Sequence, residues 1–223
     1  MSAKGTRRDL AVARVLDPAR ERAETRVQRF LDAALELLNT NASRDFTVQE
    51  VVEKSGQSLR SFYQYFDGKY ELLLALFEDS IRMAAATLSE RVERESEPLA
   101  RLRAFCVEYH GLVRQAPKDA AKASNRQWPG SALGEFAQQL LSEHPAEASR
   151  AFGPLVELLE ELVTAAVTTG DVRDDIPVRQ VVGTVLQVVM FNPFATVIAG
   201  RAGKSSDVAE DLWKILFEGL RAQ

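Results

Sequence analysis

The residues between Leu59 and Lys69 carry several side chains that can hydrogen-bond to flat or phosphate-bearing partners. Arg60 has a planar guanidinium with several donors, and Gln64 has an amide that both donates and accepts. Hydroxyl groups and one ammonium lie close by, at Ser61, Tyr63, Tyr65 and Lys69. Guanidinium and amide groups can make paired hydrogen bonds to the edge of a base, and hydroxyl and ammonium groups suit phosphate oxygens. This group of residues therefore directs attention to nucleic-acid binding.

Cys106 and His110 are the best candidates for catalysis. They lie four residues apart on a segment expected to be helical, so the thiol and the imidazole could meet on one face. A catalytic pair also needs an orienting third group and an oxyanion site, and the sequence shows neither. A packed thiol beside a histidine is the favoured interpretation, and a thiol-dependent hydrolase or transferase is the alternative. One cysteine and two histidines cannot form a Cys/His zinc site, and we predict no metal and no cofactor.

The segment from Thr47 to Tyr70 has the local signals of two short helices around a glycine turn. Thr47 and Glu50 have the spacing of a capping box, which begins a helix. Gly56 should end that helix because glycine readily adopts the left-handed conformation of a C-terminal cap. Ser58 can cap the second helix. Two helices joined in this way predict a helix-turn-helix, whose second helix can lie in the major groove of DNA.

The second helix should have an apolar back and a polar front. Leu59, Phe62 and Phe66 have the spacing of inward-facing residues, although the position of Leu59 is ambiguous. Tyr63 and Tyr65 are too close in sequence for both to face inward on a helix. We therefore expect at least one of these tyrosines to be exposed.

The rest of the chain predicts an all-α fold of about nine helices. Asp17-Pro18 should begin the first helix, after a basic arm at residues 1–16. That first helix is expected to span residues 17–39. After the helix-turn-helix, further helices are expected at 69–95, 98–117, shortly before Trp128, 133–142, 146–169, 177–199 with a kink at Asn192-Pro193, and 207–221. Gly153-Pro154 could bend or restart the helix that contains it. We assign residues 17–68 to a helix-turn-helix domain and 69–223 to a ligand-binding and dimerisation domain.

Composition excludes several classes of protein. The chain has 223 residues, 46% of them hydrophobic, which is enough for a real core. No apolar run is long enough to span a membrane, and the N-terminus lacks the apolar region of a secretory signal. One cysteine fits the reducing cytoplasm, where we expect the protein to act. The net charge of −4 does not favour DNA binding by the chain as a whole, but residues 1–29 are cationic and could touch phosphate.

The helix-turn-helix segment resembles the TetR family of bacterial transcriptional regulators. The matching positions include Thr47, Val51, Ser55, Gly56, Ser58, Phe62, Tyr63, Tyr65, Phe66, Lys69 and Leu72. The resemblance covers about residues 22–75, and beyond it only the length, the helix count and the loop that begins at Gly170 agree. Gln57 and Arg60 depart from the family pattern. Arg60 could reach the O6 and N7 atoms of a guanine, which suggests a distinctive operator.

The resemblance implies roles for the residues around the turn. Leu59 corresponds to a base-facing position, which we favour over the core, with a thymine methyl as its partner. Gln49 corresponds to a position that can reach a base edge. The positions that correspond to phosphate contacts are Thr47, Ser61, Tyr63, Tyr65 and Lys69. The predicted DNA-binding set is Thr47, Gln49, Ser58, Leu59, Arg60, Ser61, Tyr63, Gln64, Tyr65 and Lys69.

The resemblance also implies a repressor that binds a palindromic double-stranded operator as a homodimer and responds to a small molecule. Dimerisation would use the last two helices, and residues 178–199 are apolar enough to need cover on more than one face. The ligand is expected to be apolar, such as an acyl, steroid or aromatic compound. Candidate ligand-binding residues, for each of which ordinary core packing is the competing interpretation, are Phe105, Tyr109, Trp128, Phe136, Phe152, Met190, Phe191, Asn192 and Phe194. A helical protein-interaction module without DNA binding is a second alternative.

Overall fold

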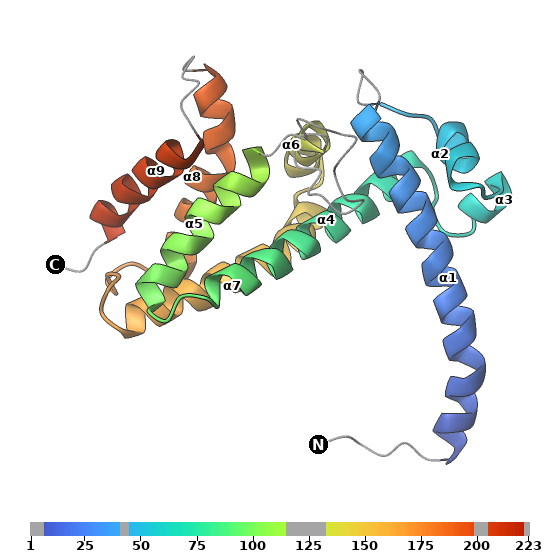
Figure 1. Ribbon diagram of the computed structural model, residues 1–223, viewed down its shortest axis with the longest axis horizontal. Coiled ribbons are helices and arrows are strands. Elements are labelled where there is room, and N and C mark those ends of the chain that lie inside the picture. The colour runs from blue at the N-terminus through green and yellow to red at the C-terminus, as the bar shows by residue number, and fades with distance from the viewer. Residues whose placement is uncertain (1–6, 41–44, 115–132, 199–204, 221–223) are drawn as a thin grey trace. The chain divides into compact units, whose positions relative to one another are not determined.

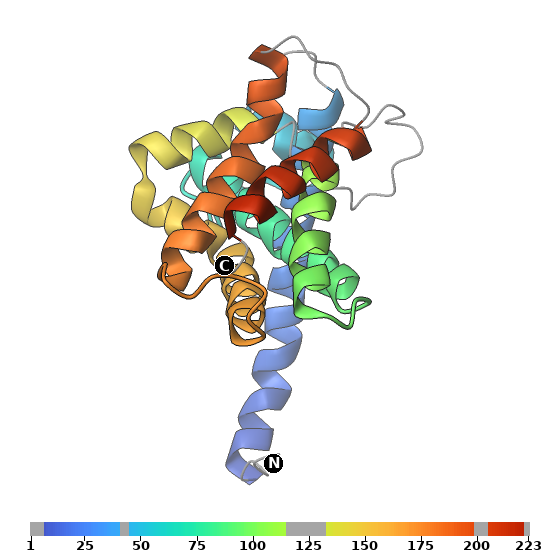
Figure 2. The same cartoon turned by 90° about the vertical axis from the view of Figure 1, so that its left-hand side faces the viewer.

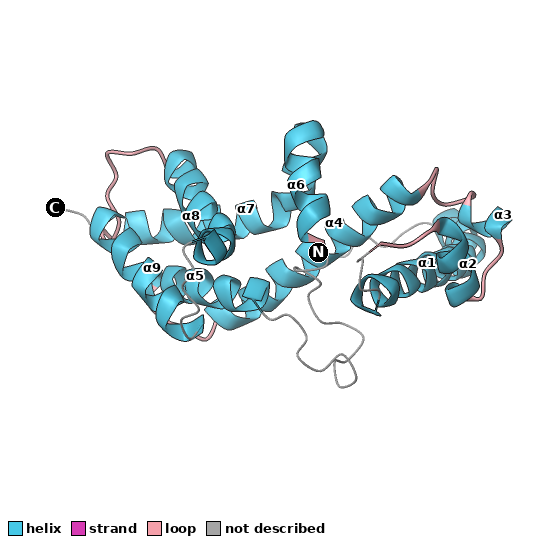
Figure 3. Ribbon diagram, turned by 90° about the horizontal axis from the view of Figure 1, so that it is seen from above, coloured by secondary structure: helices cyan, strands magenta, loops and turns pink. Residues whose placement is uncertain are grey.

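The protein was analysed as a computed structural model, which describes residues 7–40, 45–114, 133–198 and 205–220. Within these ranges the regular structure consists of nine helices and no strand, as Figure 3 shows. The predicted all-α fold is confirmed. No helix in the described part of the chain is long and apolar enough to cross a membrane. The chain divides into two compact units, Met1–Leu76 and Phe77–Gln223, which we call the first and second unit.

The first unit is built from α1 (Arg7–Thr40), α2 (Val48–Ser55), α3 (Leu59–Phe62) and the first two turns of α4 (Lys69–Val92) (Figure 1). Its core contains three aromatic rings. The Phe30 ring meets the rings of Phe62 and Phe66 edge to face, with centroids 5.5 Å and 6.1 Å apart. This arrangement is favourable for aromatic quadrupoles, and it fastens α3 and the turn after it to α1. Other buried residues of this unit are Leu31, Ala34, Leu38, Phe46, Val51 and Val52.

Helix α1 begins ten residues earlier than predicted, at Arg7 instead of Asp17. Pro18 therefore lies inside the helix, where it removes one backbone hydrogen bond. Residues 7–16 are mostly Arg, Ala, Leu and Val, and the strong helix formers Arg, Ala and Leu outweigh that local loss. The residues of the predicted basic arm before Arg7 lie outside the described part of the chain.

The second unit packs the remainder of α4 with α5 (Pro98–Arg114), α6 (Gly134–Glu143), α7 (Pro145–Thr168), α8 (Val178–Ile198) and α9 (Ser205–Leu220). Helix α7 contacts α5, α6 and α8, and α5 also contacts α8 and α9 (Figure 2). Side chains at helical spacing on α7 form the centre of the core. They are Ala148, Ala151, Phe152, Leu155, Leu159, Leu162, Val163 and Ala166.

Two of the prolines lie inside continuous helices, and the bends predicted at them stay predictions. Helix α7 runs without a restart through Pro154, because buried side chains continue on both sides of it. Helix α8 continues through Asn192-Pro193 to Ile198. Helix α7 stops two residues before Gly170, which has a left-handed φ of 79°, as predicted. Helix α4 ends at Val92, three residues earlier than expected, and the helix predicted before Trp128 lies outside the described residues.

Candidate nucleic-acid interface

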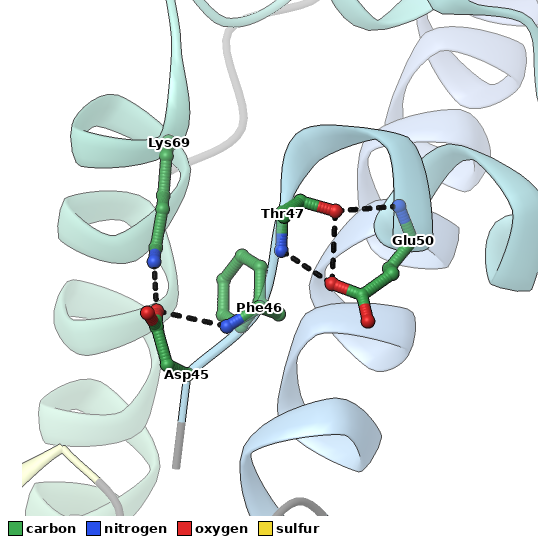
Figure 4. A network of polar contacts seen from close by, with 5 residues as sticks. All are labelled: Asp45, Phe46, Thr47, Glu50 and Lys69. Atoms are coloured by element: carbon green, nitrogen blue, oxygen red, sulfur yellow. Dashed lines mark hydrogen bonds and ion pairs between the residues drawn. The ribbon is translucent and has the colours of Figure 1, made fainter. Parts of the chain in front are cut away.

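The start of α2 is held by the predicted capping box (Figure 4). The backbone N–H of Glu50 donates to Thr47 Oγ1 over 3.2 Å, and the backbone N–H of Thr47 donates to Glu50 Oε2 over 2.6 Å. The hydrogen bond from the Thr47 N–H, together with one from the Thr47 hydroxyl, lowers the pKa of the Glu50 carboxyl below its usual value. The first turn of the helix is therefore closed on itself without help from another element.

The turn between α2 and α3 is made by a left-handed glycine and a serine cap. Gly56 has a φ of 64°, and its N–H donates to the Glu53 carbonyl oxygen over 3.2 Å. The Gln57 N–H donates to the Val52 carbonyl oxygen, so the last carbonyls of α2 are satisfied. Ser58 then caps α3, because its Oγ accepts from the Ser61 N–H over 3.1 Å. Both predicted caps are confirmed.

Helix α3 is a single turn, shorter than a recognition helix that continues to Phe66. It ends at Phe62, whose carbonyl oxygen accepts from the N–H groups of Tyr65 and Phe66. Phe62 and Phe66 are both buried, as predicted. Leu59 is 44% exposed, so the interpretation that placed it in the core is wrong. The side chain instead belongs to the surface of the unit.

Several of the predicted DNA-binding residues lie at the surface of the first unit. Tyr63 is 56% exposed and Tyr65 is half-buried, which confirms that the two tyrosines do not both face inward. The Tyr63 ring meets the buried Phe62 ring edge to face at 5.4 Å. The exposed side chains, which we call the recognition surface, are Thr47, Gln49, Ser58, Leu59, Arg60, Tyr63 and Gln64.

Two other predicted residues have a different environment. The Ser61 Oγ is buried and has no hydrogen-bond partner, so its hydroxyl does not face solvent. Lys69 forms an ion pair with the exposed Asp45, and its Nζ lies 4.9 Å from the centre of the Phe46 ring (Figure 4). Hydrogen bonds from the Lys69 ammonium and the Phe46 N–H lower the pKa of Asp45. A phosphate would have to compete with this carboxylate for Lys69.

The residues that pack beneath the recognition surface were not predicted from the sequence. Phe46 directly precedes the cap residue Thr47, the position from which a hydrophobic staple packs on the helix, and both Phe46 and Val51 are buried. That signal was present in the sequence. Lys54 also pairs with Glu36 of α1 over 2.6 Å. Neither this pair nor Asp45 with Lys69 is local in sequence, so no spacing rule could reveal them.

The predicted ligand-binding residues are only partly described. Phe105, Tyr109, Phe136 and Phe152 are all buried in the second unit. They form two separate aromatic groups among the described residues. Phe105 stacks on Tyr109 at 6.1 Å, while the Phe77 ring meets both Phe136 and Phe152 edge to face. Trp128 and the side chains of Met190, Phe191, Asn192 and Phe194 lie outside the described residues.

The Cys106 and His110 pair lacks the properties of a catalytic site. Both side chains are buried in the second unit. Burial raises the pKa of the Cys106 thiol to about 12, which keeps it protonated at neutral pH and poorly nucleophilic. No group of three His, Cys, Asp or Glu residues in the described part of the chain could hold a metal ion.

Comparison with known proteins agrees with the geometry of the first unit. Residues 30–76 match the sequence profile of the bacterial regulatory proteins of the tetR family. This range runs from Phe30 of the aromatic core to Leu76 at the end of the first unit. No curated protein matches the chain by sequence.

Solved structures of regulators share the fold over most of the chain. The transcriptional regulator FadR from Bacillus subtilis, in complex with stearoyl-CoA, has a TM-score of 0.67 and 14% identity, covering 87% of this chain and 99% of that one. The fatty acid degradation regulator FadR from Bacillus halodurans has a TM-score of 0.64 and 15% identity, covering 89% and 97%. A TetR family regulator from Cytophaga hutchinsonii has a TM-score of 0.65 and 15% identity, covering 91% and 98%. Residues 30–76 thus match the tetR family of bacterial regulatory proteins, and the chain as a whole shares its fold with solved transcriptional regulators.

Proposed function

We propose that this protein is a transcriptional repressor that binds a palindromic operator as a homodimer and leaves it when a small apolar molecule binds the second unit. The observation that carries this proposal is the recognition surface. Phe62 and Phe66 hold α3 and its turn against α1, and the side chains that could read DNA remain at the surface. Such a protein acts in the bacterial cytoplasm, on DNA and not as an enzyme.

The exposed residues have chemistry suited to distinct parts of a duplex. The Arg60 guanidinium can bridge the O6 and N7 atoms of guanine, and the Gln64 amide can pair with adenine. Leu59 offers an apolar contact to a thymine methyl. Tyr63 and Tyr65 can donate to phosphates, which sets the register of the protein on DNA. The Thr47 hydroxyl would first have to give up its hydrogen bond to Glu50. The buried Ser61 hydroxyl would need to turn outward before it could do the same.

Binding to DNA upstream of its own gene provides the direct test. The regulator should bind one such duplex specifically and weaken steeply as salt is raised, because phosphate contacts release counterions. Arg60→Ala should cost about 1–3 kcal/mol on the preferred sequence and relax the preference at one base pair. An unchanged base preference would exclude this role for Arg60. Failure of the protein to bind any promoter duplex would favour a protein-interaction module instead.

The ion pair between Lys69 and Asp45 supplies a second, sharper test. If Lys69 holds a phosphate, Lys69→Ala should weaken binding to all sequences alike. Asp45→Asn should have the opposite effect, because it releases the ammonium from its carboxylate partner. Equal weakening by both substitutions would show that the pair has a structural role only.

A homodimer through α8 and α9 is supported by an apolar residue on the surface of α9. Ile215 is 71% exposed, while the neighbouring rings of Trp213 and Phe217 stack at 5.6 Å. A second copy packed on α8 and α9, as the family resemblance implies, would cover this side chain. Ile215→Asp should give a monomer in analytical ultracentrifugation. Leu141→Asp, at an exposed leucine on α6, is the matched control and should leave the dimer intact.

The ligand is proposed to carry a long acyl chain. The support is the likeness in fold to the Bacillus subtilis regulator bound to stearoyl-CoA, together with the aromatic interior of the second unit. Long-chain acyl-CoA should release the protein from its operator, whereas free coenzyme A should not. Release requires that the ligand bind the DNA-free form more tightly than the DNA-bound form. Tight binding with no change in DNA affinity would contradict the proposed regulation.

A further inference from the structure

We propose that the N-terminal part of α1 is a second DNA-binding element, which lays a row of arginines along the phosphates that flank the operator. This inference rests on the proposed function. The segment concerned, residues 7–29, precedes the part of the chain that matches the tetR family profile. It has no counterpart in the helix-turn-helix itself, so a role for it must come from its own residues.

This part of α1 projects from the rest of the first unit. No side chain of residues 17–29 is buried, and all but Ala23 and Val27 are exposed. The buried positions of α1 begin at Phe30. Figures 1 and 2 both show the helix continuing well beyond α2 and α3 in the same unit. A helix exposed on all sides gains little from packing, so its surface is available for a partner.

The charges on this helix segment are sorted by side. With about 100° of rotation per residue, Arg22, Arg26 and Arg29 fall within an arc of about 60°. We call these three residues the arginine stripe. The acidic residues of the exposed segment, Asp17, Glu21 and Glu24, fall within another arc of about 60° on the far side.

The arginine stripe carries unneutralised charge. Arg20, which lies on the acidic side, donates to Glu24 over 2.7 Å and so is paired within the helix. Arg22 and Arg26 have no acidic residue three or four positions away, and the Asp32 carboxylate, three positions after Arg29, accepts from Gln28 over 2.9 Å. None of the three stripe arginines forms an ion pair with a described residue. Paired charges of opposite sign commonly stabilise isolated helices, and here they occur on one side only. The stripe therefore suits a partner that supplies the negative charge.

A duplex fits this stripe better than a membrane does. Residues 17–29 span about 20 Å as a helix, which is enough to follow several phosphates along one strand of a duplex. A helix that binds in a lipid interface has a broad apolar face beside its basic one. Between residues 17 and 29 the only large aliphatic side chain is Val27, and the side opposite the stripe is acidic. Charge complementarity without an apolar face favours phosphates as the partner.

Duplexes of two lengths test the proposal. One is the shortest duplex that the full-length protein binds specifically, and the other adds ten base pairs of unrelated sequence at each end. The added flanks should tighten binding about tenfold and steepen the salt dependence by about one unit for each phosphate contacted. The combined variant Arg22→Gln, Arg26→Gln and Arg29→Gln should lose this gain and still bind the short duplex normally.

A matched pair of single substitutions separates the stripe from net charge. Arg26→Gln and Arg20→Gln remove the same charge from opposite sides of one helix, and glutamine keeps a similar helix propensity. Only Arg26→Gln should reduce the gain from the flanks, with unchanged helicity by circular dichroism. Equal losses from both, or wild-type binding that ignores the flanks, would overturn the proposal and leave the proposed function standing.

Two further outcomes would also reject it. If the stripe variants lost binding to phosphatidylserine vesicles while their gain from DNA flanks was unchanged, the stripe would serve a membrane. If the wild-type protein bound no duplex specifically, both the proposed function and the proposed role of the stripe would be rejected. The short duplex therefore reports on the proposed function, and the flanks report on the stripe alone.

Discussion

The two units of the molecule differ in whether their polar and reactive side chains are exposed or buried. In the first unit Arg60, Tyr63 and Gln64 are exposed. In the second unit Cys106 and His110 are buried, and burial raises the pKa of the Cys106 thiol. The first unit can therefore meet a large partner without rearrangement. The second unit can act on a small molecule only if that molecule reaches its interior.

The units also differ in what determines their local structure. The helix ends of the first unit are set by residues close in sequence, such as the reciprocal hydrogen bonds of Thr47 and Glu50 and the left-handed Gly56. The second unit depends on packing between distant helices, with α5 and α7 at its centre. Short-range polar contacts specify a conformation residue by residue, whereas apolar packing tolerates many sequences. This difference explains why the first unit carries the family match.

Labelling of the single cysteine gives the largest expected contrast between the units. Cys106 should react with a maleimide at neutral pH at least about a thousandfold more slowly in the native protein than in denaturant, because it is buried and protonated. The matched control is Tyr63→Cys in a Cys106→Ser background. That thiol lies at the recognition surface and should react at nearly the unfolded rate. Rapid native labelling of Cys106 would show that the interior of the second unit is open.

Phe62→Ala should selectively destabilise the first unit. It removes the ring that packs between Phe30 and Phe66, and a cavity of this kind costs about 3–5 kcal/mol. Hydrogen exchange of the α2 amides should accelerate, while tryptophan fluorescence should follow the wild-type unfolding curve. Both tryptophans, Trp128 and Trp213, belong to the second unit. If the fluorescence transition shifted by the same amount, the two units would unfold as one.

Tyr63→Ala is the matched control for that experiment. The Tyr63 ring contacts Phe62 but is more than half exposed, so its removal should change stability by less than about 1 kcal/mol. DNA binding should nevertheless weaken if Tyr63 holds a phosphate. A stability loss as large as that of Phe62→Ala would mean that the ring belongs to the core.

The same contrast explains what the sequence could reveal. The caps at Thr47, Gly56 and Ser58 were predicted and confirmed because each depends on neighbours within four residues. The partner of Lys69 was not foreseen, because Asp45 lies 24 residues away and becomes its neighbour only when the chain folds. The surface position that we favoured for Leu59 agrees with its exposure, whereas its spacing to Phe62 alone suggested the core.

The extent of α1 was mispredicted for a related reason. Pro18 was taken as a helix start, but the helix-forming residues before it continue the helix back to Arg7. In the second unit the helices follow their apolar periodicity closely. That pattern is identical for a core residue and for a residue that lines a ligand site, and Phe105 and Phe136 are buried in either case. Periodicity therefore predicts burial and leaves the ligand undetermined.

Alanine substitution at the two left-handed glycines should destabilise one unit each, with a similar loss in the free energy of unfolding. Gly56 and Gly170 have φ values of 64° and 79°, and a Cβ added at either meets no atom within 4 Å. The penalty is therefore backbone strain, about 1–2 kcal/mol at each site. Gly56→Ala should accelerate amide exchange in α2, and Gly170→Ala should lower the stability measured by tryptophan fluorescence.

Gly183→Ala is the control, since Gly183 is an exposed glycine inside α8 without a positive φ. It should stabilise the protein slightly, because alanine is the better helix former. Destabilisation by Gly183→Ala would indicate that this face of α8 is covered by a second copy of the chain.

The smallest expected effect is the acid response of the α2 cap. The folded pKa of Glu50 is depressed by its hydrogen bonds with Thr47, so its contribution to stability is present above the ordinary pKa of a glutamate. That contribution is lost as the pH falls through the folded pKa. Glu50→Gln keeps an oxygen acceptor for the Thr47 N–H but cannot titrate. The protection of α2 amides should therefore depend on acid in the wild type and be less sensitive in the variant.

Asp175 provides the counterpart in the second unit. Its pKa is lowered by a hydrogen bond from the Arg173 guanidinium, and the two groups make a bidentate pair at 2.6 Å and 2.5 Å. As with Glu50, the contribution of Asp175 to stability is lost as the pH falls through its lowered pKa. Asp175→Asn should flatten the acid response of tryptophan fluorescence and leave α2 exchange unchanged. A crossed result, in which either substitution altered the other unit, would mean that protonation is coupled between the two units.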